Sequence, residues 1–486
     1  RTIARTVARN RHVARRMMST SANTAQSGSN LTTAVVGVAG FAGGMTLAMN
    51  STPASAANQT TAEALKSISG ALVGMKASLE RIEKNLGCSL PDGWWLNWGK
   101  IDESNPNNTE DFKYKVYDAR PPMVHTSQGG KHKSLMCKHL TDELFEKLKN
   151  KTTSKGYTLS HAIQTGVMTP HLGVGITAGD EESWEVFKDI LYPVIKGWHG
   201  FDPYTEKHKS DLNPDHVTQT DEQLAKFNQY VVSTRIRAAR NVSGYALPAG
   251  ASAADRHGVA VTLQKAFSKF KGELAGTYYD LGSMTDEQRS YLRSNGFLFQ
   301  KPKPTNLLTY CGAARSWPND RGIFHNKDET ALAWCNEEDH CRIISMSKDG
   351  DVKSVFRRFC NLSHAIKESI EADGGKFMYS DRLGFLGTCA SNLGTGLRAS
   401  VMIKLPELNK DVEKLEDICE AFDLQPRGSA GEHSAAVGAK WDISNKQRIG
   451  FSEAQLVQKM VNGVTKLIAI EEKLAAGKPV VKGVDY

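Results

Sequence analysis

Five arginines stand in apolar or glycine-rich segments of this chain, where a charged side chain is unusual. They are Arg235, Arg237, Arg342, Arg398 and Arg427. A guanidinium group is planar, permanently charged and forked, so it matches the oxygens of a phosphate group. Several arginines that converge would hold a triphosphate without a glycine-rich loop. Taken singly, each arginine is more often part of a surface salt bridge, and the sequence alone does not show convergence.

Motifs for the common phosphate and metal sites are absent from the sequence. There is no GxxxxGK[ST] segment, which excludes a P-loop enzyme. There is no HRD or DFG triplet, which excludes the protein-kinase set. No HExxH and no CxxC indicates a zinc site. The eight cysteines are too sparse for a disulfide scaffold, so we expect a reducing or redox-neutral compartment in which any special cysteine is reactive.

Length and composition predict a multidomain globular protein. The chain has 486 residues, of which 40% are hydrophobic and 23% charged, enough for a sizeable core. Its net charge of +8 comes mainly from six arginines in residues 1–62, which contain no Lys, Asp or Glu. A body that binds nucleic acid would keep a basic surplus or stripe outside this segment. We therefore expect no nucleic-acid partner.

The N-terminal residues 1–61 are expected to be a targeting segment. Arg, Ala, Ser and Thr without acidic residues are typical of a mitochondrial transit peptide. The apolar segment 34–49 is shorter than the roughly 20 residues that a membrane span needs. It is interpreted as a second sorting signal, toward the inner membrane or intermembrane space, with membrane association as one outcome. The alternative is a flexible linker.

Residues 62–88 predict a helix with a heptad stripe. Apolar residues recur at alternating spacings of three and four, and Gly87 ends the helix. Such a stripe favours a coiled coil and therefore a homo-oligomer. The alternative is that the stripe packs on the body of its own subunit.

The body divides into two parts of different pattern, which indicates an α+β fold. Residues 90–210 are expected to be helical, residues 211–228 a linker, and residues 229–486 a larger domain of strands and helices. Helices are expected at Thr141–Lys149, Glu182–Ile195, Val355–Ala372 and Asp411–Phe422. Strands are expected at Tyr230–Arg235, Ala331–Cys335, Cys341–Met346 and Leu397–Leu405.

The segment Thr388–Arg398, which reads TCASNLGTGLR, closely resembles the signature Cys-Pro-[Ser/Thr]-Asn-Leu-Gly-Thr of the phosphagen (guanidino) kinases. Further blocks look like family blocks in family order: Ser233–Arg237, Trp317–Asn326, Trp334–His340, Ile403–Pro406 and Asp442–Asn445. The resemblance covers about residues 90–478. It implies a small all-helical N-terminal domain and a larger domain whose antiparallel sheet is flanked by helices. It also implies reversible transfer of the γ-phosphoryl group of Mg-ATP to a guanidino compound, an energy-buffering reaction.

By this resemblance, the nucleotide site is built from the five arginines, which would hold the phosphates of ATP or ADP, with His325 at the adenine. Mg²⁺ would bridge phosphate oxygens, with no direct protein ligand and with Glu337 and Asp339 as outer-shell candidates. Arginine charges would neutralise the transferring group, because phosphoryl transfer depends mostly on positioning and electrostatics.

The resemblance also implies a guanidino site of three catalytic residues. Glu338 matches the carboxylate that grips the guanidinium through two parallel hydrogen bonds and aims one nitrogen at the γ-phosphorus. Glu432 lies where arginine kinases carry a second carboxylate. Cys389 matches the reactive cysteine, whose thiolate would contact the guanidinium; the alternative is a small buried residue. Ala390 replaces the usual proline, so the local turn is expected to be less rigid.

Substrate choice is expected to depend on the loop 166–180, which is as short as in arginine kinases. Its specificity positions are Leu172, Gly173, Val174, Gly175 and Thr177. Thr177 replaces a tyrosine, and Leu172 a small polar residue, so recognition of an α-amino acid head group is weakened. Ser391 and Ala435–Val437 are creatine-kinase-like, and Met402 replaces a histidine that would touch the nucleotide. L-Arginine is the first expectation, and taurocyamine, another guanidino compound or creatine the alternative. A protein-arginine kinase and a non-catalytic mitochondrial membrane scaffold are remote alternatives.

Overall fold

The computed structural model describes residues 34–38, 45–49, 115–123, 132–303, 306–428 and 437–486. The chain divides into two units, Arg1–Asp102 and Glu103–Tyr486. Of the targeting segment expected for residues 1–61, only residues 34–38 and 45–49 are described, and the heptad helix expected for residues 62–88 lies outside the described residues. Across the described ranges, no helix has both the length and the apolar character that a membrane span requires.

In the first unit, strand β1 (Ala34–Val38) pairs antiparallel with β2 (Met45–Met49). These strands fall in the apolar segment that was interpreted as a sorting signal or a linker. Neither interpretation predicted that this segment forms paired strands.

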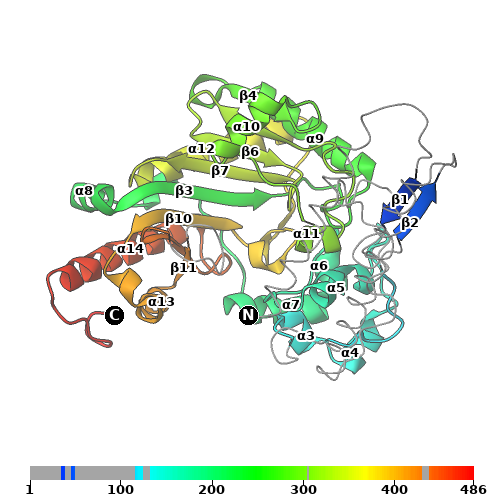
Figure 1. Cartoon of the computed structure of the whole chain (residues 1–486), viewed down its shortest axis with the longest axis horizontal. Helices are drawn as coiled ribbons and strands as arrows, with labels where there is room; N and C mark the ends of the chain where they lie inside the picture. Colours follow the sequence, from blue (N-terminus) through cyan, green and yellow to red (C-terminus); the bar gives the residue numbers. More distant parts are fainter. Residues whose placement is uncertain (1–33, 39–44, 50–114, 124–131, 304–305, 429–436) are drawn as a thin grey trace, which may run out of the picture. The chain divides into compact units, whose positions relative to one another are not determined.

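An eight-stranded antiparallel sheet forms the centre of the second unit, in the order β11-β12-β10-β3-β7-β6-β5-β4 (Figure 1). The strands are β3 (Val231–Arg240), β4 (Gly276–Asp280), β5 (Gly322–Asn326), β6 (Ala331–Cys335), β7 (Cys341–Ser347), β10 (Leu397–Lys404), β11 (Leu424–Gly428) and β12 (Lys440–Asn445). A hairpin of two short strands, β8 (Tyr379–Ser380) and β9 (Gly384–Phe385), lies outside this sheet. The sheet confirms the predicted α+β fold class.

The two faces of the sheet have opposite character because successive side chains of a strand point to opposite sides. On β3, Ile236 and Ala238 are buried in the main core, whereas Arg235 and Arg237 alternate with them. On β10, Leu397 and Ala399 enter the same core. The strands that build the apolar core therefore also expose a row of arginines on the other side.

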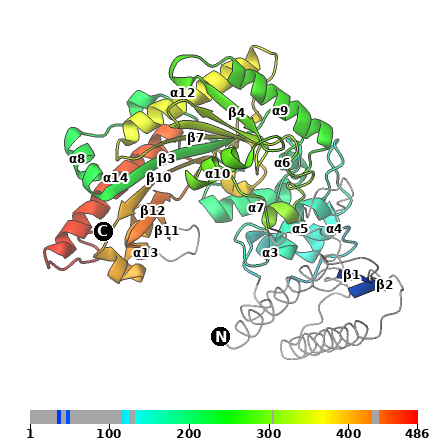
Figure 2. The same ribbon diagram turned by 45° about the horizontal axis from the view of Figure 1, so that its top comes forward.

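Long helices cover the apolar face, as Figure 2 shows for α9 and α12. The helices that pack on strands are α9 (Ala253–Ser268), α12 (Val352–Glu371), α13 (Val412–Ala421) and α14 (Glu453–Ala475). Helix α12 has nine buried residues spaced along one side, the pattern of an amphipathic helix lying on a core. Helix α10 (Asp286–Ser294) belongs to a smaller cluster around Trp317 and Trp334.

A helical layer precedes the sheet in the chain. It contains α3 (Leu135–His139), α4 (Asp142–Leu148), α5 (Leu159–Met168), α6 (Ser183–Val186) and α7 (Lys188–His199). Ser134, Thr141 and Thr158 cap the first three of these helices by accepting backbone N–H bonds. Gly200, with φ of 73°, ends α7 in the left-handed conformation that favours glycine. The short helix α11 (Leu307–Tyr310) packs against α5.

Most expected elements are present, with informative differences. The expected helix Glu182–Ile195 is interrupted at Phe187, which separates α6 from α7. The predicted linker 211–228 contains only a 3₁₀ turn at Pro214–His216 before helix α8 (Asp221–Tyr230) begins. Thr220 and Gln223 form a capping box there, so residues 221–228 are helical and not linker.

A buried ion pair ties the start of α14 to the end of β3. Arg240 Nη2 lies 3.3 Å from Glu453 Oε1, and both side chains are at most 1% exposed. Glu453 also accepts hydrogen bonds from Ser210 Oγ and Asp211 N. Arg240 donates to the Thr395 carbonyl, and its Cζ lies 3.6 Å from the centroid of the Phe385 ring. This pair therefore joins β3 and α14 to three further segments, at residues 210–211, Phe385 and Thr395.

Glu453→Gln should lower the free energy of unfolding by about 3–5 kcal/mol, because it leaves a buried guanidinium without its counter-charge. Denaturant unfolding followed by circular dichroism measures this loss. Glu472→Gln is the control, since the side chains of the Lys226–Glu472 pair are 42% and 36% exposed and solvent screening should make the loss of this pair far less costly. Equal effects of the two substitutions would contradict the structural role of Glu453.

Candidate active site

Four of the predicted arginines lie together on the polar side of the sheet, which we name the arginine face: Arg235, Arg237, Arg398 and Arg427. Strand register places Arg237 directly opposite Arg398, and Arg427 opposite Asp442. Cross-strand partners are close neighbours on one face of a sheet. The convergence that the sequence left open is therefore present.

A cavity of about 340 Å³ opens on the arginine face. All four arginines line it, together with Asn295 and Gly296 after α10 and with Met402 on β10. Asp442 supplies a carboxylate oxygen 3.0 Å from Arg398 Nη2. The lining is dominated by positive charge, so it suits a compact polyanion.

Electrostatics in the cavity are unfavourable to the arginines themselves. Burial, followed by the charges of Arg342 and Arg398, lowers the pKa of Arg235 to about 10. The pKa of Arg237 is lowered well below its usual value by burial and by four neighbouring arginines. Like charges at such short range destabilise one another unless an anion lies between them. The arrangement therefore favours binding of an anion.

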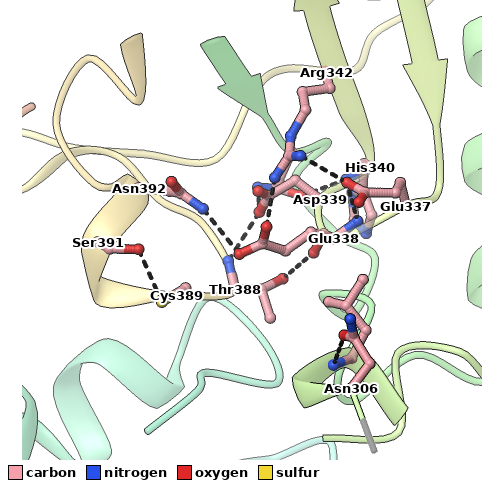
Figure 3. A network of polar contacts seen from close by, with 12 residues as sticks. Asn306, Glu337, Glu338, Asp339, His340, Arg342, Thr388, Cys389, Ser391 and Asn392 are labelled. Carbon is pink, nitrogen blue, oxygen red and sulfur yellow. Dashed lines mark hydrogen bonds and ion pairs between the residues drawn. The ribbon is translucent and has the colours of Figure 1, made fainter. Parts of the chain in front are cut away.

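Carboxylates meet Arg342, the fifth predicted arginine, at the hairpin between β6 and β7, whose residues 336–340 we call the carboxylate loop. Arg342 lies 3.0 Å from Glu337 Oε2 and 2.5 Å from Glu338 Oε2. Figure 3 shows both carboxylates turned toward the Arg342 guanidinium. Burial acts to lower the pKa of Arg342, but the adjacent acids outweigh it and the net shift is upward.

Glu338 is held from both sides. Its Oε1 accepts a hydrogen bond from Asn392 Nδ2 at 3.0 Å, and its backbone carbonyl accepts one from Thr388 Oγ1 at 2.7 Å. Arg448 in turn donates to Asn392 Oδ1. A carboxylate fixed in this way is oriented before a ligand arrives, which is the geometric requirement for gripping a planar cation.

Asp339 fastens the carboxylate loop instead of facing the cavity. Its Oδ1 accepts from Asn241 Nδ2 and from Thr388 N, both at 2.9 Å, and the residue is 1% exposed. Burial and the charge of Glu338 raise the pKa of Asp339 to about 6. This enclosed position does not fit the outer-shell magnesium role expected of Asp339, because a metal-bound water needs an open path to the carboxylate.

Cys389 lies on the segment 388–392, which we call the cysteine loop. Its Sγ is 3.1 Å from Ser391 Oγ. Burial and the charge of Glu338 raise the pKa of the thiol to about 11, although the Ser391 hydroxyl acts to lower it. The thiolate expected from the sequence is therefore not favoured at neutral pH, because burial and the charge of Glu338 outweigh the hydrogen bond with Ser391.

The specificity loop 166–180 packs on α3 and on the cysteine loop. Leu172 N donates to the Thr169 carbonyl, and the carbonyls of Gly173 and Val174 accept from α3 backbone N–H groups at 2.7 and 3.0 Å. Gly175, with φ of 79°, leaves no room for a Cβ beside Ser134. The loop is therefore fixed at its outer side.

Thr177 pairs by a backbone bridge with Cys389, and Ala178 N donates to the Thr388 carbonyl at 2.8 Å. The Thr177 hydroxyl, however, lies 3.1 Å from Tyr157 Oη, and the residue is 3% exposed. Thr177 thus positions the cysteine loop through its backbone, while its side chain belongs to the helical domain. It presents no polar group to a substrate.

His325, expected at the adenine, lies beside the cavity. Its ring stacks on Tyr279 with centroids 5.1 Å apart and lies 6.2 Å from the ring of Phe297. Phe297 adjoins Gly296 of the cavity lining. His325 is 8% exposed and does not itself line the cavity. Glu432 lies outside the described residues.

Arg448 is a candidate that the sequence reasoning missed. Its pKa is lowered to about 10 by burial and by Arg398 and Arg427, so it belongs to the same charge cluster. It follows the block Asp442–Asn445 by three residues, in an irregular segment with no strand alternation to mark it. Asn392 is a second such residue, because its contact with Glu338 joins segments 54 positions apart.

The acidic side chains near the cavity decide how the protein could contact a Mg²⁺ ion. In the ranges that the structure describes, no three His, Cys, Asp or Glu side chains are grouped to hold a metal ion. Glu337 remains 14% exposed at the rim of the carboxylate loop. A partly exposed carboxylate at this rim suits a water-mediated contact with a Mg²⁺ held by nucleotide phosphates, since that ion binds substrate phosphates and keeps several waters.

Comparison with known protein families matches both domains of this chain to one family. Residues 130–196 match the N-terminal domain of the ATP:guanido phosphotransferases, and residues 259–474 match their C-terminal catalytic domain. The creatine kinase M-type of Gallus gallus is 43% identical over 381 residues, which are 78% of this chain and 97% of that protein.

Solved structures agree with this relationship. A lombricine kinase crystal structure is 43% identical, with a TM-score of 0.67 over 72% of this chain and 94% of that one. The duplicated taurocyamine kinase of Schistosoma mansoni with bound transition-state-analogue components is 37% identical, with a TM-score of 0.64 over 70% of this chain and 46% of that one. With its helical domain, its antiparallel sheet and these relatives, this chain belongs to the ATP:guanido phosphotransferase, or phosphagen kinase, family.

Proposed function

We propose that this protein reversibly transfers the γ-phosphoryl group of Mg-ATP to a guanidino compound that lacks an α-amino acid head group, with creatine as the first candidate. The observation that carries the proposal is the placement of the arginine face beside Glu338, an oriented carboxylate. One half of this arrangement suits a polyphosphate and the other a planar cation. Taurocyamine is the second candidate.

Phosphoryl transfer would use the arginine face as an electrostatic clamp. Arg235, Arg237, Arg398 and Arg427 would surround the phosphates, and Arg342 would lie between them and Glu338. Charge that develops on the transferring group is then stabilised by groups that are already in place. When bound, Mg²⁺ supplies further neutralisation of the phosphate oxygens, and Glu337 would reach it through water.

Glu338 would grip the guanidinium and turn one nitrogen toward the γ-phosphorus. Asn392 supports this carboxylate from the opposite side, so it keeps its orientation when the cation arrives. Cys389 would contact the same cation, and the contact would lower the thiol pKa from its raised ligand-free value. Glu432 remains a proposed second carboxylate.

The side chain of Thr177 argues against arginine, which was expected first. Its hydroxyl is engaged by Tyr157 and enclosed in the helical domain, so it cannot hold an amino acid head group. The similar proteins are named as kinases of creatine, lombricine and taurocyamine. Loop length and Glu432 still favour arginine, which stays in the test as the third candidate.

Location and assembly extend the proposal. Residues 1–61 have the composition of a mitochondrial transit peptide, and the heptad stripe in residues 62–88 favours a homo-oligomer. Membrane association would involve the segment 34–49. Import into isolated mitochondria tests the targeting role of residues 1–61. Light scattering of the protein with and without residues 62–88 measures the mass of the oligomer and tests the heptad stripe.

A coupled assay of ADP release by the full chain with creatine, taurocyamine, lombricine, glycocyamine and arginine tests the substrate. Creatine should give the highest kcat/KM. A clear preference for arginine would contradict the argument from Thr177. Turnover with none of the five would contradict the enzymatic assignment.

In the same assay, Glu338→Gln should lower kcat by at least about 100-fold, because a misaligned nucleophile loses the benefit of orientation. Glu368→Gln, exposed on α12, should leave kcat unchanged. Full turnover by the Glu338 variant would remove that residue from the guanidinium clamp.

Arg237→Met should separate stability from binding. Removing a buried cation that its neighbours repel should keep or raise the melting temperature of the ligand-free protein, whereas Mg-ADP should no longer raise it. Thermal unfolding with and without Mg-ADP measures both effects. Arg357→Met, at an exposed position on α12, should retain the nucleotide shift. An undiminished shift in the Arg237 variant would exclude it from the phosphate site.

Alkylation of Cys389 by iodoacetamide should be slow at pH 7 and rise steadily toward pH 11 in the ligand-free enzyme, because only the thiolate reacts and its pKa is raised to about 11. Ser391→Ala should move this profile to higher pH, since the hydroxyl bond that lowers the pKa is lost. Peptide mass spectrometry over a pH series measures the rates. A rate that is already maximal below pH 8 would refute the raised pKa.

A further inference from the structure

Two cysteines face each other across the base of the carboxylate loop. Cys335 ends β6 and Cys341 begins β7, and the two are direct partners in the antiparallel register. One step beyond them, Asn336 N donates to the His340 carbonyl at 2.9 Å. Hydrogen-bonded and non-hydrogen-bonded pairs alternate along such a ladder, so Cys335 and Cys341 form a non-hydrogen-bonded pair.

Non-hydrogen-bonded partners have the closest side chains in an antiparallel sheet, with Cα atoms about 4.5 Å apart. Disulfides span Cα separations of about 4.4–6.8 Å, so this register lies within the range, at its short end. Both thiols are free, 0% exposed and part of the same core cluster. Their side chains therefore lie on the same face of the sheet, as a cross-strand bond requires.

We propose that Cys335 and Cys341 are a reversible disulfide site that closes the carboxylate loop. A low-molecular-weight disulfide such as glutathione disulfide would be the oxidant. One cysteine thiolate attacks it and releases one glutathione thiol, forming a mixed disulfide. The second thiolate then attacks the protein sulfur of that mixed disulfide and releases the other glutathione. The protein loses two protons and two electrons in all, and these reduce glutathione disulfide to two glutathione thiols.

The bond would act on the site because the ring it closes contains Glu337, Glu338 and Asp339. Arg342, the partner of Glu338, follows Cys341 directly. A disulfide at the short end of the allowed range stores strain, which makes it easier to reduce and displaces the strands that carry it. Oxidation should therefore shift Glu338 relative to Arg342 and lower turnover, and reduction should restore it. This consequence rests on the proposed function, whereas formation of the bond does not.

Reaction of the native protein should be slow. Burial raises the pKa of Cys335 to about 12 and also raises that of Cys341, so thiolates are scarce at neutral pH. Local opening at the end of the hairpin must precede exchange. Low urea or mildly alkaline pH should therefore accelerate oxidation.

Peptide mapping tests the bond directly. After incubation of the full chain with glutathione disulfide in low urea and alkylation of free thiols, trypsin releases the peptide 328–342, which contains Cys335 and Cys341 and no other cysteine. Its mass should be two hydrogens below that of the reduced peptide, without alkyl groups, and dithiothreitol should reverse this. Alkylation of both cysteines at every glutathione ratio, or a mixed disulfide that never closes, would overturn the proposal.

Variants separate this pair from Cys389. Cys335→Val and Cys341→Val should each prevent ring closure, whereas Cys360→Ala, which changes another buried cysteine of the same core, should leave it intact. Turnover lost on oxidation should return with dithiothreitol and should be preserved in Cys335→Val. If the disulfide forms in the wild type but the wild type and Cys335→Val lose turnover equally on oxidation, the regulatory consequence fails. Cys389 is then the group whose oxidation lowers turnover. Absence of turnover before oxidation would instead contradict the proposed function.

Discussion

Mutual repulsion among the arginines of one sheet face is the constraint on which the rest of this structure depends. Arg235, Arg237 and Arg398 point to one side because side chains alternate along a strand, and burial together with neighbouring cations lowers the pKa values of the first two. The same strands bury Ile236 and Ala399 on the other side. Hydrophobic packing beneath the sheet therefore holds an electrostatic arrangement that is favourable only when an anion is bound.

Counter-charges surround this cluster without filling it. Asp442 pairs with Arg398, and Glu337 and Glu338 pair with Arg342, so the acids lie at the rim. Glu338 is the shared element, because it also accepts a hydrogen bond from Asn392. An anion among the arginines and a cation at Glu338 would each complete an interaction that the ligand-free protein leaves partly unmet. This explains how one site can recognise two oppositely charged substrates.

Orientation of the cysteine loop depends on the helical domain. Ala178 donates to the Thr388 carbonyl, and His199 Nε2 lies 3.0 Å from the Ala390 carbonyl. Burial lowers the pKa of His199 to about 4, so it is a neutral donor here. The helices thus fix the backbone on both sides of Cys389. A change at the end of α7 or in the specificity loop would therefore be felt at the thiol.

Alternation, helical spacing and the family blocks were sufficient to predict the fold class, the elements on β6, β7 and β10, and the arginines. They did not predict β5, where the polar residues His325 and Asn326 follow Ile323 and Phe324 without alternation, or β11, which contains Pro426. They also missed Arg448, the enclosure of Asp339, the burial of the Thr177 hydroxyl and the raised pKa of Cys389. These properties depend on contacts between residues that are distant in the sequence, such as Thr177 with Tyr157, 20 positions apart, and Thr388 with Asp339, 49 positions apart. Local pattern determines which face of an element a side chain occupies, whereas desolvation and charge at that position depend on which other segments pack there.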